Sequence, residues 1–153
     1  MGLLTPLAVR IGAISWMPNL LPQIVVVDKL LQRVTMQRYT ILDVAGLPNL
    51  VLTVTGRKSG LPRTTPLLCV PDGERILIAG SNFGGPKEPL WVKNIEANPA
   101  VTVRIGGVES KRVATMLEGE DRAQAWKTML AVWPNFAKYE ERTDRRIKVF
   151  ELS

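Results

Sequence analysis

Histidine is absent from the 153 residues of this chain, and cysteine occurs once, as Cys69. These two absences exclude a Ser-His-Asp triad, a Cys-His pair, an internal disulfide and a histidine-ligated metal site. The chain also lacks the ligands of a structural zinc site, so we expect no metal. Cys69 is expected to be a buried structural residue. A bound redox cofactor would supply chemistry that these side chains cannot perform.

Acidic residues are outnumbered, with 14 Asp and Glu against 20 Lys and Arg, and none lies between Asp43 and Asp72. The same stretch contains Arg57, Lys58 and Arg63. A net charge of +6 implies an anionic partner: nucleic acid, a membrane surface or a phosphorylated small molecule. The cluster is short and is not interleaved with aromatic residues, which argues against nucleic acid. One anionic small molecule fits it better.

No hydrophobic run is long enough to predict a membrane span. Residues 11–27 carry no charge, but Pro18, Asn19, Pro22 and Gln23 interrupt them. The start of the chain also lacks the pattern of a secretory signal peptide. Together with the single cysteine, this predicts a cytoplasmic protein.

The first forty residues are expected to be helical. An apolar stripe with helical spacing is formed by Val27, Leu30, Leu31 and Val34. The favoured interpretation is a helix packed on the domain, and the alternative is a basic amphipathic segment resting on a membrane. The sequence does not decide between a monomer and a homodimer.

From residue 50 onward the pattern changes to short strands separated by turns. The Asp72-Gly73 turn predicts a hairpin of strands 64–70 and 75–79. This order of elements favours one α+β domain over 1–153, with a helical segment at 1–45 and a mostly antiparallel barrel at 46–153. The other expected strands are 50–55, 101–105, 108–117 and 147–152, and the expected helices are 89–97, 120–133 and 135–142.

The strongest local motif is Gly56-Arg-Lys-Ser-Gly-x-Pro-Arg63. A glycine-flanked basic turn between two strands can bind a phosphate through backbone N–H groups and cationic side chains. It is not a Walker A loop, because the glycine spacing differs and a strand precedes it. A solvated hairpin turn explains the same residues equally well, so both interpretations stay open.

Two weaker patterns follow. The loop from Ser81 to Gly85 lies between a strand and a helix, where backbone donors can hold polar ligand groups. Trp133, Phe136 and Tyr139 recur every three residues beside Pro134. These aromatic residues form either a core face or an apolar wall over a flat substrate.

Taken together, these motifs resemble the deazaflavin-dependent nitroreductase family, the branch of split β-barrel flavoproteins that uses coenzyme F420 in place of FMN. The resemblance runs from about residue 50 to the C-terminus. It rests on Thr55-Gly-Arg-Lys-Ser-Gly-x-Pro-Arg63, Pro66-Leu67, Asp72-Gly73, Ser81 through Pro89-x-Trp91-x-x-Asn94, Asn98-Pro99 and Thr143-Asp144-Arg145.

The resemblance implies a reductase that delivers hydride from reduced F420 to an electron-poor acceptor such as a quinone, an enone, an unsaturated lactone or a nitroaromatic compound. It implies that the basic turn holds the phosphate and acidic tail, while the next strand, the Ser81 loop and the following helix surround the deazaflavin. The implied cofactor residues are Arg57, Lys58, Ser59, Arg63, Thr64, Thr65, Pro66, Leu67, Leu68, Ala79, Gly80, Ser81, Asn82, Leu90, Trp91, Val92, Lys93 and Asn94.

Ser81 is the first candidate for polarising the acceptor and Tyr139 the second, and the implied substrate wall is Leu68, Trp133, Phe136 and Tyr139. Relatives that reduce nitroimidazoles carry tyrosines where this chain has Leu68, Trp133 and Phe136, so we expect weak or absent nitroimidazole reduction. Two alternatives remain: an FMN-dependent enzyme on the same barrel, and a non-enzymatic cofactor-binding module at a membrane surface.

Overall fold

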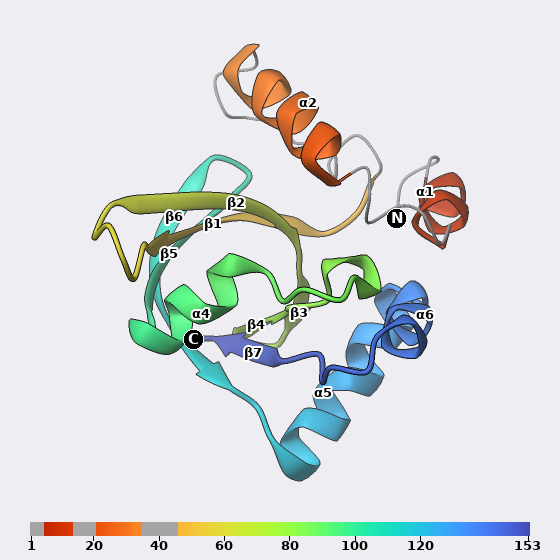
Figure 1. The fold of residues 1–153 in the computed structure, drawn as a ribbon. Helices are drawn as coiled ribbons and strands as arrows, with labels where there is room; N and C mark the ends of the chain where they lie inside the picture. Colours follow the sequence, from red (N-terminus) through yellow and green to blue (C-terminus); the bar gives the residue numbers. More distant parts are fainter. Residues whose placement is uncertain (1–4, 14–20, 35–45) are drawn as a thin grey trace.

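The computed structural model describes residues 5–13, 21–34 and 46–153, which form one curled antiparallel sheet with helices around it (Figure 1). The sheet has seven strands in the order β2-β1-β5-β6-β7-β4-β3. It curls into a half-open barrel, so the split-barrel expectation is confirmed. The strands are β1 (Asn49–Thr55), β2 (Pro62–Leu68), β3 (Val70–Asp72), β4 (Arg75–Ala79), β5 (Ala100–Ile105), β6 (Val108–Met116) and β7 (Val149–Leu152).

One helix lies within the curl of the sheet, and two others cover one of its ends. In Figure 1, α4 lies across the inside of the barrel, whereas α5 and α6 cover the β3–β4–β7 end. Pro89 precedes α4 and Pro134 precedes α6, positions where proline suits a helix start. The described helices are α1 (Thr5–Gly12), α2 (Leu21–Val34), the short 3₁₀ helix η2 (Asn82–Gly84), α4 (Leu90–Ala97), α5 (Gly119–Val132) and α6 (Asn135–Arg142).

Alternation along the strands builds the core. On β1, Leu50, Leu52 and Val54 are buried, whereas Thr53 and Thr55 are partly exposed on the other face. One buried cluster joins this inner face to Trp91 of α4 and to β7, and a second lies under α5 and α6. The two clusters fix α4 and α6 relative to the sheet, and the candidate site is built between these helices and β2.

The expected hairpin of strands 64–70 and 75–79 is wrong in its first strand. β2 pairs with β1 along its whole length, and only the short β3 pairs with β4 through the Asp72-Gly73 turn. Cys69 separates β2 from β3, and its N–H donates to the Pro48 carbonyl at 3.0 Å. The chain crosses there from one half of the curled sheet to the other, so a single apolar run supplies two strands. Cys69 itself is buried, as expected.

The helix expected near Val27 is present as α2, and its apolar stripe is covered only in part, since Leu31 is partly buried whereas Val27 and Leu30 are exposed. Val27 and Leu30 are 54% and 60% exposed, and Val26 is 65% exposed, whereas Asp28 is buried. The helix therefore buries an aspartate and leaves three of its apolar side chains largely exposed. The side chain of Val34 lies outside the described residues. In the part of the chain that is described, no helix is long and apolar enough to cross a membrane.

Candidate active site

The basic turn between β1 and β2 is closed by its own hydrogen bonds. Gly56 N–H donates to the Leu61 carbonyl and Gly60 N–H to the Gly56 carbonyl, each at 2.8 Å. The Ser59 hydroxyl accepts from Leu61 N–H at 3.2 Å and from Arg63 Nη2 at 3.4 Å. Gly60 has φ of +69°, a conformation that favours glycine. The turn therefore has a defined backbone, and Ser59 ties the Arg63 side chain to it.

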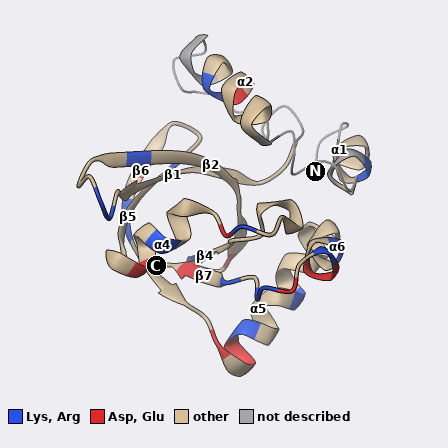
Figure 2. Cartoon of the chain, viewed as in Figure 1, with Lys and Arg blue, Asp and Glu red and all other residues tan. Residues whose placement is uncertain are grey.

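Arg57, Lys58 and Arg63 are all exposed, and none forms an ion pair with a carboxylate of the described residues. Figure 2 shows lysine and arginine on this turn and on β2, with no acidic residue on the turn. Uncompensated cations on a fixed turn attract a polyanion. The donor set thus fits the phosphate and acidic tail of coenzyme F420, and the phosphate-binding interpretation of the motif is favoured over the plain turn.

Asn94 joins this turn to α4. Its Oδ1 accepts from Arg57 N–H at 3.1 Å and from Arg57 Nη1 at 3.3 Å, and the side chain is only 6% exposed. Trp91 and Val92 of the same helix are buried in the core, with Trp91 edge-on to Phe150 at 5.9 Å between ring centroids. These two implied cofactor residues therefore lie in the core of the domain. Only Leu90 and Lys93 of the implied α4 residues are exposed.

Strand β2 provides the open wall between the turn and the rest of the site. It is an edge strand that pairs only with β1 among the described residues, and Pro66 suits such an edge. Exposure falls along the strand. Arg63 and Thr64 are exposed, whereas Thr65, Pro66, Leu67 and Leu68 are partly buried. The strand thus changes from a charged end at the turn to an apolar end, which suits a ligand with an anionic tail and a flat ring.

The loop after β4 has an unusual backbone. Asn82 and Phe83 have φ of +45° and +53°, a region that residues other than glycine rarely adopt. The side-chain amide of Asn82 donates to the Lys87 carbonyl at 2.9 Å. Gly80 must be glycine because a Cβ there would approach Val92 Cγ2 to 2.7 Å. Ser81 and Ala79 are partly buried, and the Ser81 hydroxyl makes no hydrogen bond within the described parts of the chain.

Tyr139 lies in the core and not on an open wall. It is 2% exposed, and its hydroxyl accepts a hydrogen bond from Trp133 Nε1 at 3.3 Å. Burial raises the pKa of Tyr139 to about 12. Phe136 and Trp133 are 3% and 5% exposed in the same cluster, and Leu68 packs against it. Because all three aromatic side chains are buried, the structure favours the core interpretation. Their spacing in the sequence fits a core face and a substrate wall equally well.

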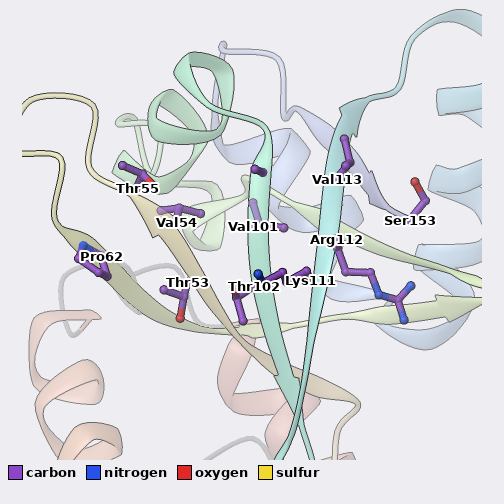
Figure 3. A pocket seen from close by; sticks show the side chains of 11 residues that line it. Thr53, Val54, Thr55, Pro62, Val101, Thr102, Lys111, Arg112, Val113 and Ser153 are labelled. Carbon is purple, nitrogen blue, oxygen red and sulfur yellow. The ribbon is translucent and has the colours of Figure 1, made fainter.

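A hollow lies on the outer face of β1, β5 and β6, and no sequence motif predicted it (Figure 3). This cavity of about 540 Å³ is lined by side chains that include Thr53, Thr55, Thr102 and Lys111. Neither Arg57 nor Ser81 lines it. The alternation of threonines on β1 could have indicated a partly exposed face, but not its curvature. Over the described residues, no cluster of acidic or sulfur side chains could hold a metal ion.

Comparison with known proteins identifies the family. The sequence model of the F420H2-dependent quinone reductases matches residues 29–153. The chain belongs to this family. An F420H2-dependent quinone reductase of Mycobacterium tuberculosis is 37% identical over 111 residues, which cover 69% of this chain and 73% of that protein. The expected reductase family and the expected F420 dependence are therefore confirmed at the level of the family.

Two solved structures share the fold. An F420H2-dependent reductase, FDR-A, superimposes with a TM-score of 0.65 at 39% identity, covering 69% of this chain and 94% of that one. A second structure, described as a domain-swapped dimer, gives a TM-score of 0.67 at 35% identity and covers 83% and 96% of the two chains. The fold is thus shared with an F420H2-dependent reductase.

Proposed function

We propose that this protein transfers a hydride from reduced coenzyme F420 to a quinone. The observation that carries the proposal is a set of three exposed cations on a hydrogen-bonded turn at the charged end of the edge strand β2. Among the residues that the structure describes, no carboxylate forms an ion pair with these cations. The family supplies the identity of the coenzyme, and the turn supplies a place for its anionic part.

The residues act through binding and orientation. Arg57, Lys58 and Arg63 neutralise the tail, while Asn94 holds Arg57 in position. Leu67 and Leu68 offer apolar surface to the ring. The coenzyme supplies the hydride, and the protein holds the acceptor close to it, which in general is worth about 7–11 kcal/mol. The Ser81 hydroxyl polarises the acceptor oxygen by donating a hydrogen bond.

The acceptor class is narrower than electron-poor compounds in general. The tyrosine donors expected of nitroimidazole reducers are missing at Leu68, Trp133 and Phe136, and Tyr139 is engaged with Trp133 in the core. We infer that quinones are reduced and that nitroimidazole turnover is weak or absent. Robust nitroimidazole reduction by the purified protein would contradict this.

The deciding experiment is a fluorescence titration with oxidised F420 and, separately, with FMN. We expect tight F420 binding by the wild type, weakened at least tenfold by Lys58→Ala. The matched control is Lys127→Ala, which removes an exposed lysine from α5, far from the turn. Preferential FMN binding would show that the protein is an FMN-dependent enzyme. Binding of neither ligand would favour a non-enzymatic protein at a membrane surface.

We also propose that the protein is cytoplasmic and rests peripherally on anionic lipid through α2. Exposed Val26, Val27 and Leu30 could enter the interface while Lys29 stays at the headgroups, and quinones are apolar enough to reside in membranes. Flotation with phosphatidylglycerol vesicles should be lost in Val27→Asp/Leu30→Asp and in high salt. Equal flotation of wild type and variant would contradict this placement.

A homodimer is the assembly we propose. A related structure is described as a domain-swapped dimer, and the turn end of the β5–β6 hairpin of this chain exposes Ile105 and Val108, which pair across the two strands. Such an apolar set on a surface marks an interaction site. Light scattering after gel filtration should give twice the chain mass, and Val108→Lys should shift the protein toward the monomer. A monomer at all concentrations would contradict the proposal.

A further inference from the structure

The guanidinium of Arg145 binds the loop between β4 and α4. Arg145 itself belongs to the segment that connects α6 to β7. Arg145 Nη1 donates to the Gly80 carbonyl at 2.9 Å, Nη2 to the Ser81 carbonyl at 2.8 Å and Nε to the Gly85 carbonyl at 3.1 Å. Each of the three nitrogen atoms thus binds a different carbonyl of one loop. Only a planar fork of fixed donors can make this pattern, and a lysine ammonium cannot copy it.

A second arginine and a close packing contact also hold this loop. Arg142 Nη1 donates to the Phe83 carbonyl at 3.3 Å. Gly84 lies so near α6 that a Cβ would come within 2.6 Å of the Tyr139 carbonyl oxygen. The carbonyls of residues 80, 81, 83 and 85 are therefore held from the α6 side, and the loop backbone has a fixed position there.

The contacts from Arg145 and Arg142 hold a loop whose backbone is strained. The positive φ angles of Asn82 and Phe83 are unfavourable for non-glycine residues and persist only where surrounding contacts impose them. Arg145 is partly buried, and desolvation is the main cause that lowers its pKa, opposed by the charge of Glu88. The three hydrogen bonds offset the hydration that the guanidinium loses, and together they hold the loop in one conformation.

We propose that Arg145 is a positioning residue for the hydride-transfer reaction, holding the strained loop so that the Ser81 hydroxyl stays where the acceptor oxygen binds. Arg145 touches neither coenzyme nor acceptor and acts through the backbone of residues 80–85. The catalytic consequence rests on the proposed function. The conformational consequence does not, because the loop contacts exist whatever the ligand.

The first test measures the loop without any ligand. Gly84 N–H donates to the Ser81 carbonyl and Gly85 N–H to the Asn82 carbonyl, both at 2.8 Å, so their exchange with deuterium reports loop closure. We expect at least tenfold faster exchange at these two amides in Arg145→Lys. The control is Arg146→Ala, the neighbouring exposed arginine, whose ion pair to Glu118 is 4.0 Å long. Unchanged exchange in Arg145→Lys would overturn the proposal.

The second test separates positioning from binding. In single-turnover reactions with both quinone and F420H2 at saturating concentration, where weaker binding no longer limits the rate, we expect Arg145→Lys to oxidise F420H2 at least tenfold more slowly. Added guanidinium ion should restore part of the rate in Arg145→Ala. A folded Arg145→Lys enzyme with the wild-type rate would also overturn the proposal. If the wild type binds no F420, the proposed function fails, whereas the exchange experiment still decides the role of Arg145.

Discussion

Arg57 and Asn94 are joined by two hydrogen bonds that converge on a single atom, because the backbone N–H and the guanidinium of Arg57 both donate to Asn94 Oδ1. Asn94 is buried in α4, whereas Arg57 is exposed on the basic turn. The helix therefore fixes one of the cations proposed to bind the coenzyme, so we expect buried Asn94 to affect coenzyme binding through Arg57.

Asn94→Ala should weaken F420 binding about tenfold, equivalent to about 1.4 kcal/mol, because Arg57 loses both hydrogen bonds to Asn94 and gains freedom that binding must remove. Fluorescence titration measures the dissociation constant. The matched control is Asn98→Ala, since Asn98 lies just beyond the same helix and its Oδ1 accepts from Ala100 N–H at 3.2 Å. Equal losses in both variants would show that the effect is not specific to the turn.

Ser81→Ala and Tyr139→Phe should separate the two candidates for polarising the acceptor. We expect Ser81→Ala to lower kcat about 100-fold, the usual loss when one donor to a developing oxyanion is removed, with little change in stability. Tyr139→Phe should leave kcat within about twofold, because the phenol is buried against Trp133. It should instead lower the free energy of unfolding by about 1–3 kcal/mol, since Trp133 Nε1 loses its acceptor. Steady-state kinetics and urea denaturation give both quantities.

Local signals in the sequence predicted several elements closely. The helix expected at 135–142 is α6 residue for residue, because Pro134 sets its start, and the strand expected at 75–79 is β4. The basic turn was also recognisable, since its glycines and cations are contiguous. These features depend on neighbouring residues, which a single sequence displays directly.

Long-range features could not be predicted in the same way. The partner of β2 is decided by the curl of the whole sheet, which the Asp72-Gly73 turn does not reveal. The contact of Arg145 with Gly80 joins residues 65 positions apart in the chain. The spacing of Phe136 and Tyr139 fits both a core face and a substrate wall, and only the packing against α5 distinguishes the two.

Two glycines with similar backbone angles should respond differently to alanine. Gly84 has φ of +76° and little space, because a Cβ would meet the Tyr139 carbonyl oxygen at 2.6 Å, whereas Gly60 has φ of +69° and nothing within 4 Å. Gly60→Ala should therefore cost only the left-handed penalty of about 1–2 kcal/mol. Gly84→Ala should cost more, because α6 or the loop must also shift. Thermal denaturation measures both, and a smaller loss for Gly84→Ala would contradict the packing described for this loop.

The protein should lose stability as the pH rises above about 9, and Cys69 should account for part of the loss. Burial raises the pKa of Cys69 from 9.0 to about 12 and that of Tyr139 from 10.0 to about 12, so the folded state keeps both groups neutral. Each contribution is complete below the pKa of the unfolded chain. It is lost as the pH rises toward the folded value, because the unfolded chain releases its protons first. The free energy of unfolding, from urea titrations, should be nearly constant between about pH 7 and 8.5 and then fall toward pH 10.5. Cys69→Ala should start lower, because it leaves a cavity, but fall less steeply, and parallel curves for the two proteins would show that the thiol does not titrate on unfolding.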